Sequence, residues 1–121
     1  MVASGLFSIV REESTTGSVS ASLAINKAHA IFKGHFPARP VVPGVCMMQI
    51  SKELTERHLQ SQTRIVEASN VKFLSVMNPL EVEQIDSTVL IHEKDDRVEI
   101  NATLFSGPIV YFKLKATLQK V

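Results

Sequence analysis

The amino-acid sequence predicts an α+β fold in which a curved antiparallel sheet wraps around one long central helix. Two patterns indicate this fold. Several runs alternate apolar and polar residues with the period of two that is typical of half-buried strands, and one long run after residue 43 has a helical composition. The expected order is two strands, the helix and four more strands with short connections, which favours an antiparallel sheet. We expect a single domain over residues 1–121.

The N-terminal part of the chain predicts two strands followed by a turn. Residues 6–13 are expected to form the first strand, and residues 14–17, rich in serine, threonine and glycine, the turn after it. Residues 27–33 are expected to make a turn whose apolar side chains enter the core. Residues 18–25 form the second expected strand, which ends at Asn26, and its apolar positions are Val19, Ala21, Leu23 and Ile25.

Residues 34–45, GHFPARPVVPGV, hold three prolines and lead into the expected helix. Proline fixes φ near −65° and moves the residue before it out of the helical region, so residues 36–42 should form a stiff, extended loop. Because proline suits the first helical position, we expect Pro43 to start a helix that ends near Gln60. His35 would then lie beside the helix N-terminus, whose free N–H groups and dipole suit a developing negative oxygen.

The expected helix changes character along its length. Its first two turns are apolar almost all round, and its last two turns are mostly polar. A helix that other elements surround needs the first pattern, whereas a helix in water shows the second. We therefore expect the first half to be buried and the second half to emerge into solvent.

Four extended runs follow the helix. They are expected at residues 64–73, 81–92, 97–105 and 109–119, with a loop at 75–80 and turns at 94–96 and 106–107. Asn70 marks an expected irregularity in the first run. In the last two runs one face is apolar, which predicts that it packs on the core. The residues of this face are Val98, Ile100, Ala102, Leu104, Val110, Phe112, Leu114, Ala116 and Leu118.

Composition excludes several classes of function. Thirteen basic and twelve acidic residues give a net charge of +1 without a basic cluster, so we expect no nucleic-acid partner and no attraction to an anionic membrane. No segment has the roughly 20 apolar residues of a membrane span, so we expect no membrane insertion. The single cysteine, Cys46, rules out an intrachain disulfide, and its apolar surroundings favour a packing role. Neither metal-ligand spacing nor a nucleotide-binding glycine pattern is present, so no metal and no cofactor are expected. Without a leader or an apolar run of membrane-spanning length, a cytoplasmic protein is expected.

A specific motif occupies the proline segment, with fixed positions at Gly34, His35, Phe36, Pro37, Pro40, Pro43, Gly44 and Val45. In these residues the chain resembles the hotdog-fold β-hydroxyacyl-(acyl carrier protein) dehydratases of fatty acid synthesis, whose hallmark is GHFPxxPxxPGV. Weaker resemblance extends over most of the chain, including NVKFLSVMNPLE at residues 70–81. It implies the hotdog fold and the dehydration of a 3-hydroxyacyl thioester.

The resemblance also implies roles for individual residues. His35 matches the catalytic histidine, which removes a proton α to the thioester carbonyl or helps to eliminate the 3-hydroxyl. The Gly44 N–H resembles the donor that polarises that carbonyl. In this family two chains pair so that the histidine of one faces the helix of the other, which implies a homodimer or a trimer of dimers acting on acyl carrier protein or another acyl thioester. The expected substrate-binding residues are Gly34, Phe36, Pro43, Gly44 and Val45.

One position departs from the family pattern. The family's second catalytic residue, a carboxylate that handles the leaving hydroxyl, falls at Gln49, whose amide has no proton to release. Glu53 lies on the same helix face, about 6 Å away at Cβ, so it could replace the missing acid. The family's usual EAxxQ order is then reversed, and the expected catalytic set is His35, Gln49 and Glu53. In the alternative reading, Glu53 is a solvated residue where the helix emerges.

Two other functions stay open. Hotdog proteins include thioesterases, and an amide that positions water beside a polarised carbonyl would serve hydrolysis. Loss of the acid also fits a non-catalytic subunit that holds acyl chains or pairs with an active homologue. No flanking motif supports a direct role for the other histidines, His29, His58 and His92.

Overall fold

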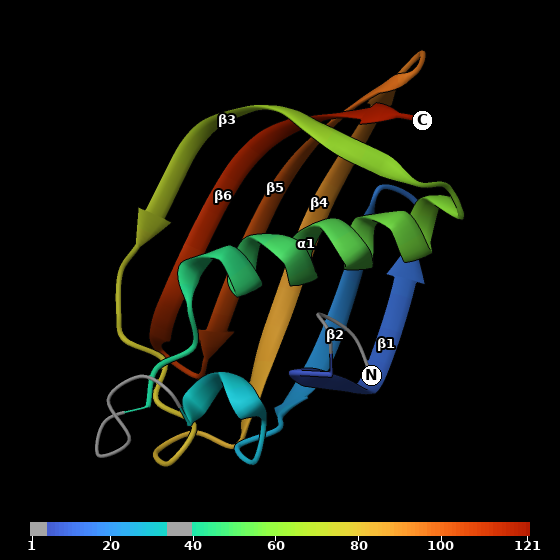
Figure 1. Ribbon diagram of the computed structural model, residues 1–121. Helices are drawn as coiled ribbons and strands as arrows, with labels where there is room; N and C mark the ends of the chain where they lie inside the picture. The colour runs from blue at the N-terminus through green and yellow to red at the C-terminus, as the bar shows by residue number, and fades with distance from the viewer. Residues whose placement is uncertain (1–4, 34–39) are drawn as a thin grey trace.

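The computed structural model describes residues 5–33 and 40–121 of the chain. In this part of the chain one long helix, α1 (Gly44–Leu59), lies across an antiparallel sheet (Figure 1). A short 3₁₀ helix, η1 (Ala30–Phe32), precedes it. The strands of the sheet are β1 (Phe7–Thr15), β2 (Ser18–Ile25), β3 (Thr63–Phe73), β4 (Gln84–Lys94), β5 (Arg97–Ser106) and β6 (Ile109–Lys120).

The strand order in the sheet is β1-β2-β4-β5-β6-β3, and all neighbouring pairs are antiparallel. β1 and β3 are therefore its two edges. The register of β3 with β6 shifts twice, between Ile65 and Glu67 and between Ala68 and Asn70. Such bulges bend a strand, and β3 arches over α1 in Figure 1. The expected curved antiparallel sheet around a long helix is confirmed, with an irregularity beside Asn70.

The core lies between α1 and the face of the sheet that α1 covers. The strands contribute alternate residues to it, as the period of two predicts. Its members from the sheet include Val19, Leu23, Ile85, Val89, Val98, Ile100, Leu104, Phe112 and Leu118. The helix buries one stripe with helical spacing, made of Met47, Ile50, Ser51, Leu54 and Thr55.

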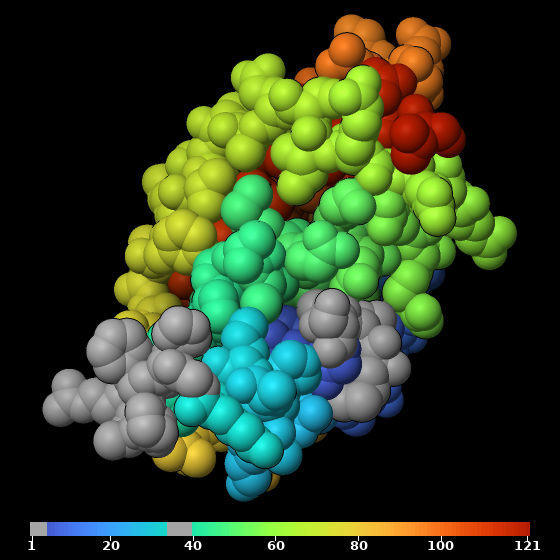
Figure 2. All heavy atoms as spheres, viewed as in Figure 1, coloured from blue at the N-terminus to red at the C-terminus, as the bar shows by residue number. Residues whose placement is uncertain are grey.

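The helix differs from the expectation in two ways. It begins at Gly44, one residue later than expected, because Pro43 is its N-cap in an extended conformation (φ −62°, ψ 145°). The expected burial of the first half alone was wrong. Val45 in the first half is 71% exposed, whereas Leu54 and Thr55 in the second half are fully buried. The sheet covers α1 from one side, and Figure 2 shows atoms of α1, in green, open to solvent on this face.

Several strand boundaries also differ from the expectation, by one to three residues. β4 begins at Gln84 rather than at residue 81, because residues 78–82 form a turn. In this turn the Asn78 side-chain oxygen accepts a hydrogen bond from the Leu80 N–H at 2.8 Å. β1 continues to Thr15, which pairs with the first residue of β2, so the connecting turn shrinks to residues 16–17.

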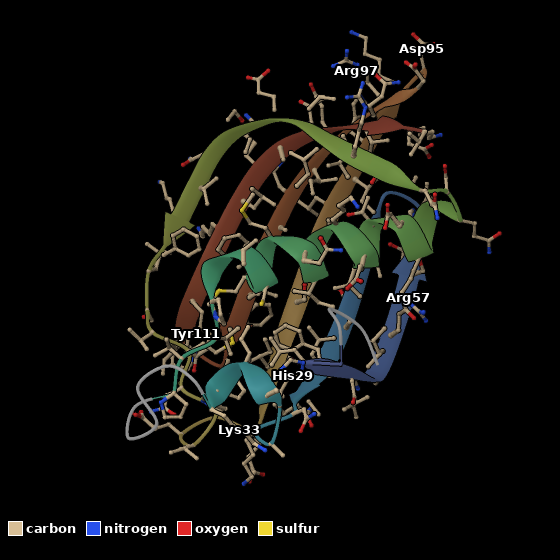
Figure 3. All side chains as sticks on the ribbon, viewed as in Figure 1. His29, Lys33, Arg57, Asp95, Arg97 and Tyr111 are labelled. Carbon is tan, nitrogen blue, oxygen red and sulfur yellow. The ribbon has the colours of Figure 1, made fainter. Side chains whose placement is uncertain are left out.

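The C-terminal end of α1 is attached to both edges of the sheet. The Glu56 carboxylate accepts hydrogen bonds from the N–H (2.6 Å) and the hydroxyl (3.1 Å) of Thr63, the first residue of β3. Arg57 forms an ion pair of 2.7 Å with Glu12 on β1, and Figure 3 shows Arg57 at this end of the helix. Gln60 ends the helix in the left-handed conformation (φ 55°). Within the described ranges, neither α1 nor η1 has the length and apolar character that a membrane-spanning helix needs.

Candidate active site

The first turn of α1 presents free backbone donors. The Pro43 C=O accepts hydrogen bonds from the N–H groups of Cys46 (3.0 Å) and Met47 (3.4 Å). The N–H groups of Gly44 and Val45 have no hydrogen-bond partner among the described residues, and Pro43 forms no side-chain cap. Helices leave their first N–H groups without an internal partner. Next to the expected Gly44 donor there is thus a second free donor, the Val45 N–H. The lack of internal partners for the first N–H groups of a helix could have predicted it.

The charge at this helix end is uncompensated within the first turn, which contains no acidic residue. A helix N-terminus carries roughly half a positive charge, and free N–H groups add directed hydrogen bonds to it. Together they stabilise a negative oxygen that approaches along the helix axis. This is the backbone arrangement that polarisation of a carbonyl requires.

The segment before α1 is packed against the loop between β3 and β4. The Val42 N–H donates a hydrogen bond of 2.9 Å to the Met77 C=O. Both side chains are buried, and so is Pro40. The end of the expected extended loop, residues 40–42, therefore fixes where the helix begins. Three predicted site residues lie outside the described residues: Gly34, His35 and Phe36.

Gln49 lies nearer to the free amides than Glu53 does. It is exposed and about 7.5 Å beyond Gly44 along the helix axis, and helical side chains point back toward the N-terminus. Glu53 is half-buried and about 13.5 Å beyond Gly44. Within one chain, therefore, Glu53 does not lie beside the amides. It lines a hollow of about 400 Å³ together with Glu56, Arg57, Gln60, Ser61 and Gln62.

Cys46, His29 and His58, the other nucleophilic or titratable candidates discussed above, take part in packing or in hydrogen bonds within the fold. Cys46 packs partly buried against the core, and burial raises the pKa of its thiol, in keeping with the expected packing role. His29 caps η1, because its Nδ1 accepts a hydrogen bond of 3.0 Å from the Ile31 N–H. His58 Nδ1 forms a hydrogen bond of 2.5 Å with the Ser14 hydroxyl.

Sequence comparison connects the chain to dehydratases. A family model described as ApeI-like, ApeI dehydratase, matches residues 11–106. The 3-hydroxyacyl-(acyl-carrier-protein) dehydratase FabZ of Rickettsia africae is 33% identical over 86 residues, which cover 64% of this chain and 55% of the relative. The FabZ of Rickettsia typhi is 31% identical over 87 residues, covering 65% and 56%. The chain thus spans about half the length of the curated relatives it matches.

Solved structures show the same fold at low sequence identity. The dehydratase heterocomplex ApeI:P from Xenorhabdus doucetiae has a TM-score of 0.76 at 18% identity, over 93% of this chain and 97% of that chain. A hypothetical thioesterase with coenzyme A from Streptococcus pneumoniae has a TM-score of 0.68 at 8% identity, over 95% and 85%. These likenesses concern the fold alone, and they confirm the expected hotdog architecture.

Proposed function

The chain belongs to the ApeI-like dehydratase family, and from this membership we propose that it eliminates water from a 3-hydroxyacyl thioester to give the trans-2-enoyl thioester. The acyl group is carried on acyl carrier protein or a related thiol, in fatty acid synthesis or a related acyl-chain pathway of the cytoplasm. The observation that carries this proposal is the pair of free amides at Gly44 and Val45, which lies at the end of the GHFPxxPxxPGV segment.

In the proposed reaction the two amides act on the thioester carbonyl. They donate hydrogen bonds to its oxygen and stabilise the negative charge that develops there. His35 removes a proton from the α carbon, the electrons of that C–H bond form the new double bond, and the C–O bond at carbon 3 breaks. The hydroxyl takes up a proton and leaves as water. Gly34, Phe36, Pro43 and Val45 line the acyl pocket.

The glutamine at position 49 affects one step of this reaction, the transfer of a proton to the leaving hydroxyl. Gln49 orients the hydroxyl or a water, because an amide does not release a proton. Glu53, one turn further along the helix, is the proposed proton donor, directly or through one water. Since Glu53 is about 13.5 Å beyond Gly44 along the axis, its role is tested separately from that of Gln49.

A second copy of the chain completes the proposed site. In a homodimer, alone or within a trimer of dimers, His35 of one chain faces α1 of the other. An apolar surface near the start of α1 supports a partner there, because contiguous exposed apolar side chains are typical of interfaces. Its residues are Val41, Val45, Phe73, Leu74 and Val76, which are 41–71% exposed. Light scattering coupled to gel filtration measures the number of chains in the assembly.

The proposal is tested with purified protein and 3-hydroxyacyl thioesters of pantetheine and of acyl carrier protein, with loss of water followed by mass spectrometry. His35→Ala is expected to lower the rate by about 10²-fold or more. Gln49→Glu restores a carboxyl near the amides and is expected to raise the rate, whereas Glu53→Gln is expected to lower it. Matched controls on β4 are His92→Ala and Gln84→Glu, both at exposed positions. A protein that converts none of the thioesters, with no gain from Gln49→Glu, contradicts the proposal.

The amide at position 49 favours a second candidate, a non-catalytic subunit that binds acyl chains or pairs with an active homologue. Tight binding of acyl carrier protein without turnover, unchanged by Glu53→Gln, would support it. Hydrolysis of the thioester is separated in the same assay, because it releases a free thiol and leaves the 3-hydroxyl group in place. Release of thiol that is lost in His35→Ala would identify a hydrolase.

A further inference from the structure

The last residue of β3 contacts the first residue of α1. A β carbon added to Gly44 would lie 2.6 Å from Cζ of Phe73, closer than real β carbons approach other atoms, and 3.3 Å from Cδ1. The ring of Phe73 therefore occupies the space that a side chain at position 44 would fill. It lies directly beside the residue whose amide is free.

The ring of Phe73 packs on the ring of Phe112, a core residue of β6. Its centroid is 5.3 Å from that of Phe112, at an interplanar angle of 36°. Phe112 is fully buried, whereas Phe73 is 58% exposed. The backbone is fixed just after the ring, because the Leu74 N–H donates a hydrogen bond of 2.9 Å to the C=O of Tyr111, which is labelled in Figure 3. An exposed aromatic ring thus rests on the core on one side and on the helix start on the other.

The backbone conformation of Gly44 does not explain why this position is a glycine. Among the glycines that the structure describes, Gly5, Gly17 and Gly107 have positive φ, and Gly44 does not. An alanine could adopt the φ of Gly44 without strain. The close approach of the Phe73 ring is the remaining reason within the described part of the chain.

We propose that Phe73 is a positioning residue of the site, which holds the Gly44 amide in place and closes one side of the approach to it. This inference rests on the proposed function, in which the Gly44 amide donates to the thioester carbonyl. With the ring in place, the carbonyl reaches the amides from the side that Phe73 leaves open. The GHFPxxPxxPGV motif ends at Val45, whereas Phe73 lies on a different element, in the run of weaker resemblance at residues 70–81.

The contact is tested by a double-mutant cycle in thermal unfolding at equal protein concentration. Gly44→Ala alone is expected to lower Tm, because its methyl group meets the ring, but only modestly, because the exposed ring of Phe73 can turn away. In Gly44→Ala/Phe73→Ala the ring is gone and the methyl group has room. The double variant is therefore expected to unfold above the temperature that the sum of the two single shifts predicts. Additive shifts would overturn the contact.

The positioning role is tested by kinetics on the dehydration reaction. A displaced donor weakens the transition state more than substrate binding, so Phe73→Ala is expected to lower kcat by about 10- to 100-fold with KM changed less than about threefold. Phe73→Leu, which keeps apolar bulk without the ring, is expected to fall in between. Leu90→Ala is the matched control, since Leu90 is 55% exposed on β4, which lies three places from β3 in the strand order.

The outcomes separate this inference from the proposed function. Wild-type protein without any turnover overturns the proposed function and the positioning role with it, whatever the unfolding cycle gives. In an active enzyme, an unchanged kcat in Phe73→Ala, or a rise in KM alone, overturns the role of Phe73 and leaves the dehydratase assignment intact. A fall in kcat together with a non-additive unfolding cycle supports both, provided that light scattering finds the same number of chains in Phe73→Ala as in the wild type; a fall that accompanies a loss of chains overturns the positioning role.

Discussion

Replacement of Ser87 with alanine is expected to stabilise the protein. Ser87 lies on β4 between Ala21 of β2 and Leu104 of β5, and it is 1% exposed. Its hydroxyl has no hydrogen-bond partner within the described part of the chain. A buried polar group without a partner costs about 1–3 kcal/mol, because it loses its hydrogen bonds to water on folding. Alanine removes this group and keeps the β carbon.

The expected gain is smaller than the full cost of the unpaired hydroxyl. The lost oxygen also made van der Waals contacts, each worth about 0.1–0.2 kcal/mol, and its removal leaves a small void. The net increase in the free energy of unfolding is therefore expected to be about 1 kcal/mol. For a chain of this length, that change raises Tm by roughly 3–5 °C.

Ser22 on the adjacent strand is the matched control. It is 6% exposed, and its hydroxyl donates a hydrogen bond of 2.9 Å to the Asp86 carboxylate. Ser22→Ala is expected to lower the free energy of unfolding by about 1 kcal/mol. Urea and thermal unfolding followed by circular dichroism at one protein concentration measure both variants. If Ser87→Ala lowers Tm as Ser22→Ala does, the Ser87 hydroxyl is hydrogen-bonded in solution and the reasoning is refuted.

Two more predictions concern the C-terminal end of α1. Glu56→Ala leaves the buried Thr63 without its hydrogen-bond acceptor and is expected to lower the free energy of unfolding, measured in urea, by about 2 kcal/mol. The control is Glu67→Ala, at an exposed position of β3, the strand that begins with Thr63, and it should change this free energy by less than about 0.5 kcal/mol. Equal effects of the two substitutions would contradict the role of Glu56. The Arg57 guanidinium lowers the pKa of the Glu12 carboxyl, mainly through its hydrogen bonds, so the folded chain binds this proton less tightly than the unfolded chain. The resulting stabilisation, below about 1 kcal/mol for so accessible a pair, is present above the ordinary glutamate pKa of about 4.3 and is lost as the pH falls through the lower folded-state value. Glu12→Gln should therefore flatten the acid side of the stability curve against pH, and an unaltered curve speaks against the pair.

Local patterns predicted the strands well, because each strand has one face on the core and alternation reports that face directly. The expected run at residues 97–105 differs from β5 by one residue. The burial of α1 was wrong for a related reason. Apolar composition does not tell which side a sheet will cover, so Val45 and Met47 look alike in the sequence, yet they are 71% and 3% exposed. Their spacing, not their composition, separates them.

The candidate site was predicted only as far as the motif extends. The motif located the helix start and its Gly44 donor, because prolines act on the residues next to them. It did not place Glu53 along the helix relative to the amides. The contact between Gly44 and Phe73 could not be predicted from local sequence patterns, because the two residues are brought together only by the course of β3 in the fold. The assignment of His35 stays a prediction, because this residue lies outside the described residues.

β3 and α1 meet at both of their ends, through Thr63 and Glu56 at one end and through Phe73 and Gly44 at the other. The strand has 11 residues and would be about 36 Å long if straight, whereas the 16-residue helix is about 24 Å long. The strand is therefore an arc whose chord is the helix, and its bulges take up the difference in length (Figure 1). Deletion of one extra residue, Val66 or Ser69, would restore regular pairing with β6 and shorten the arc by about 3.3 Å. The number of residues in this edge strand is thus set by the length of the helix that it spans.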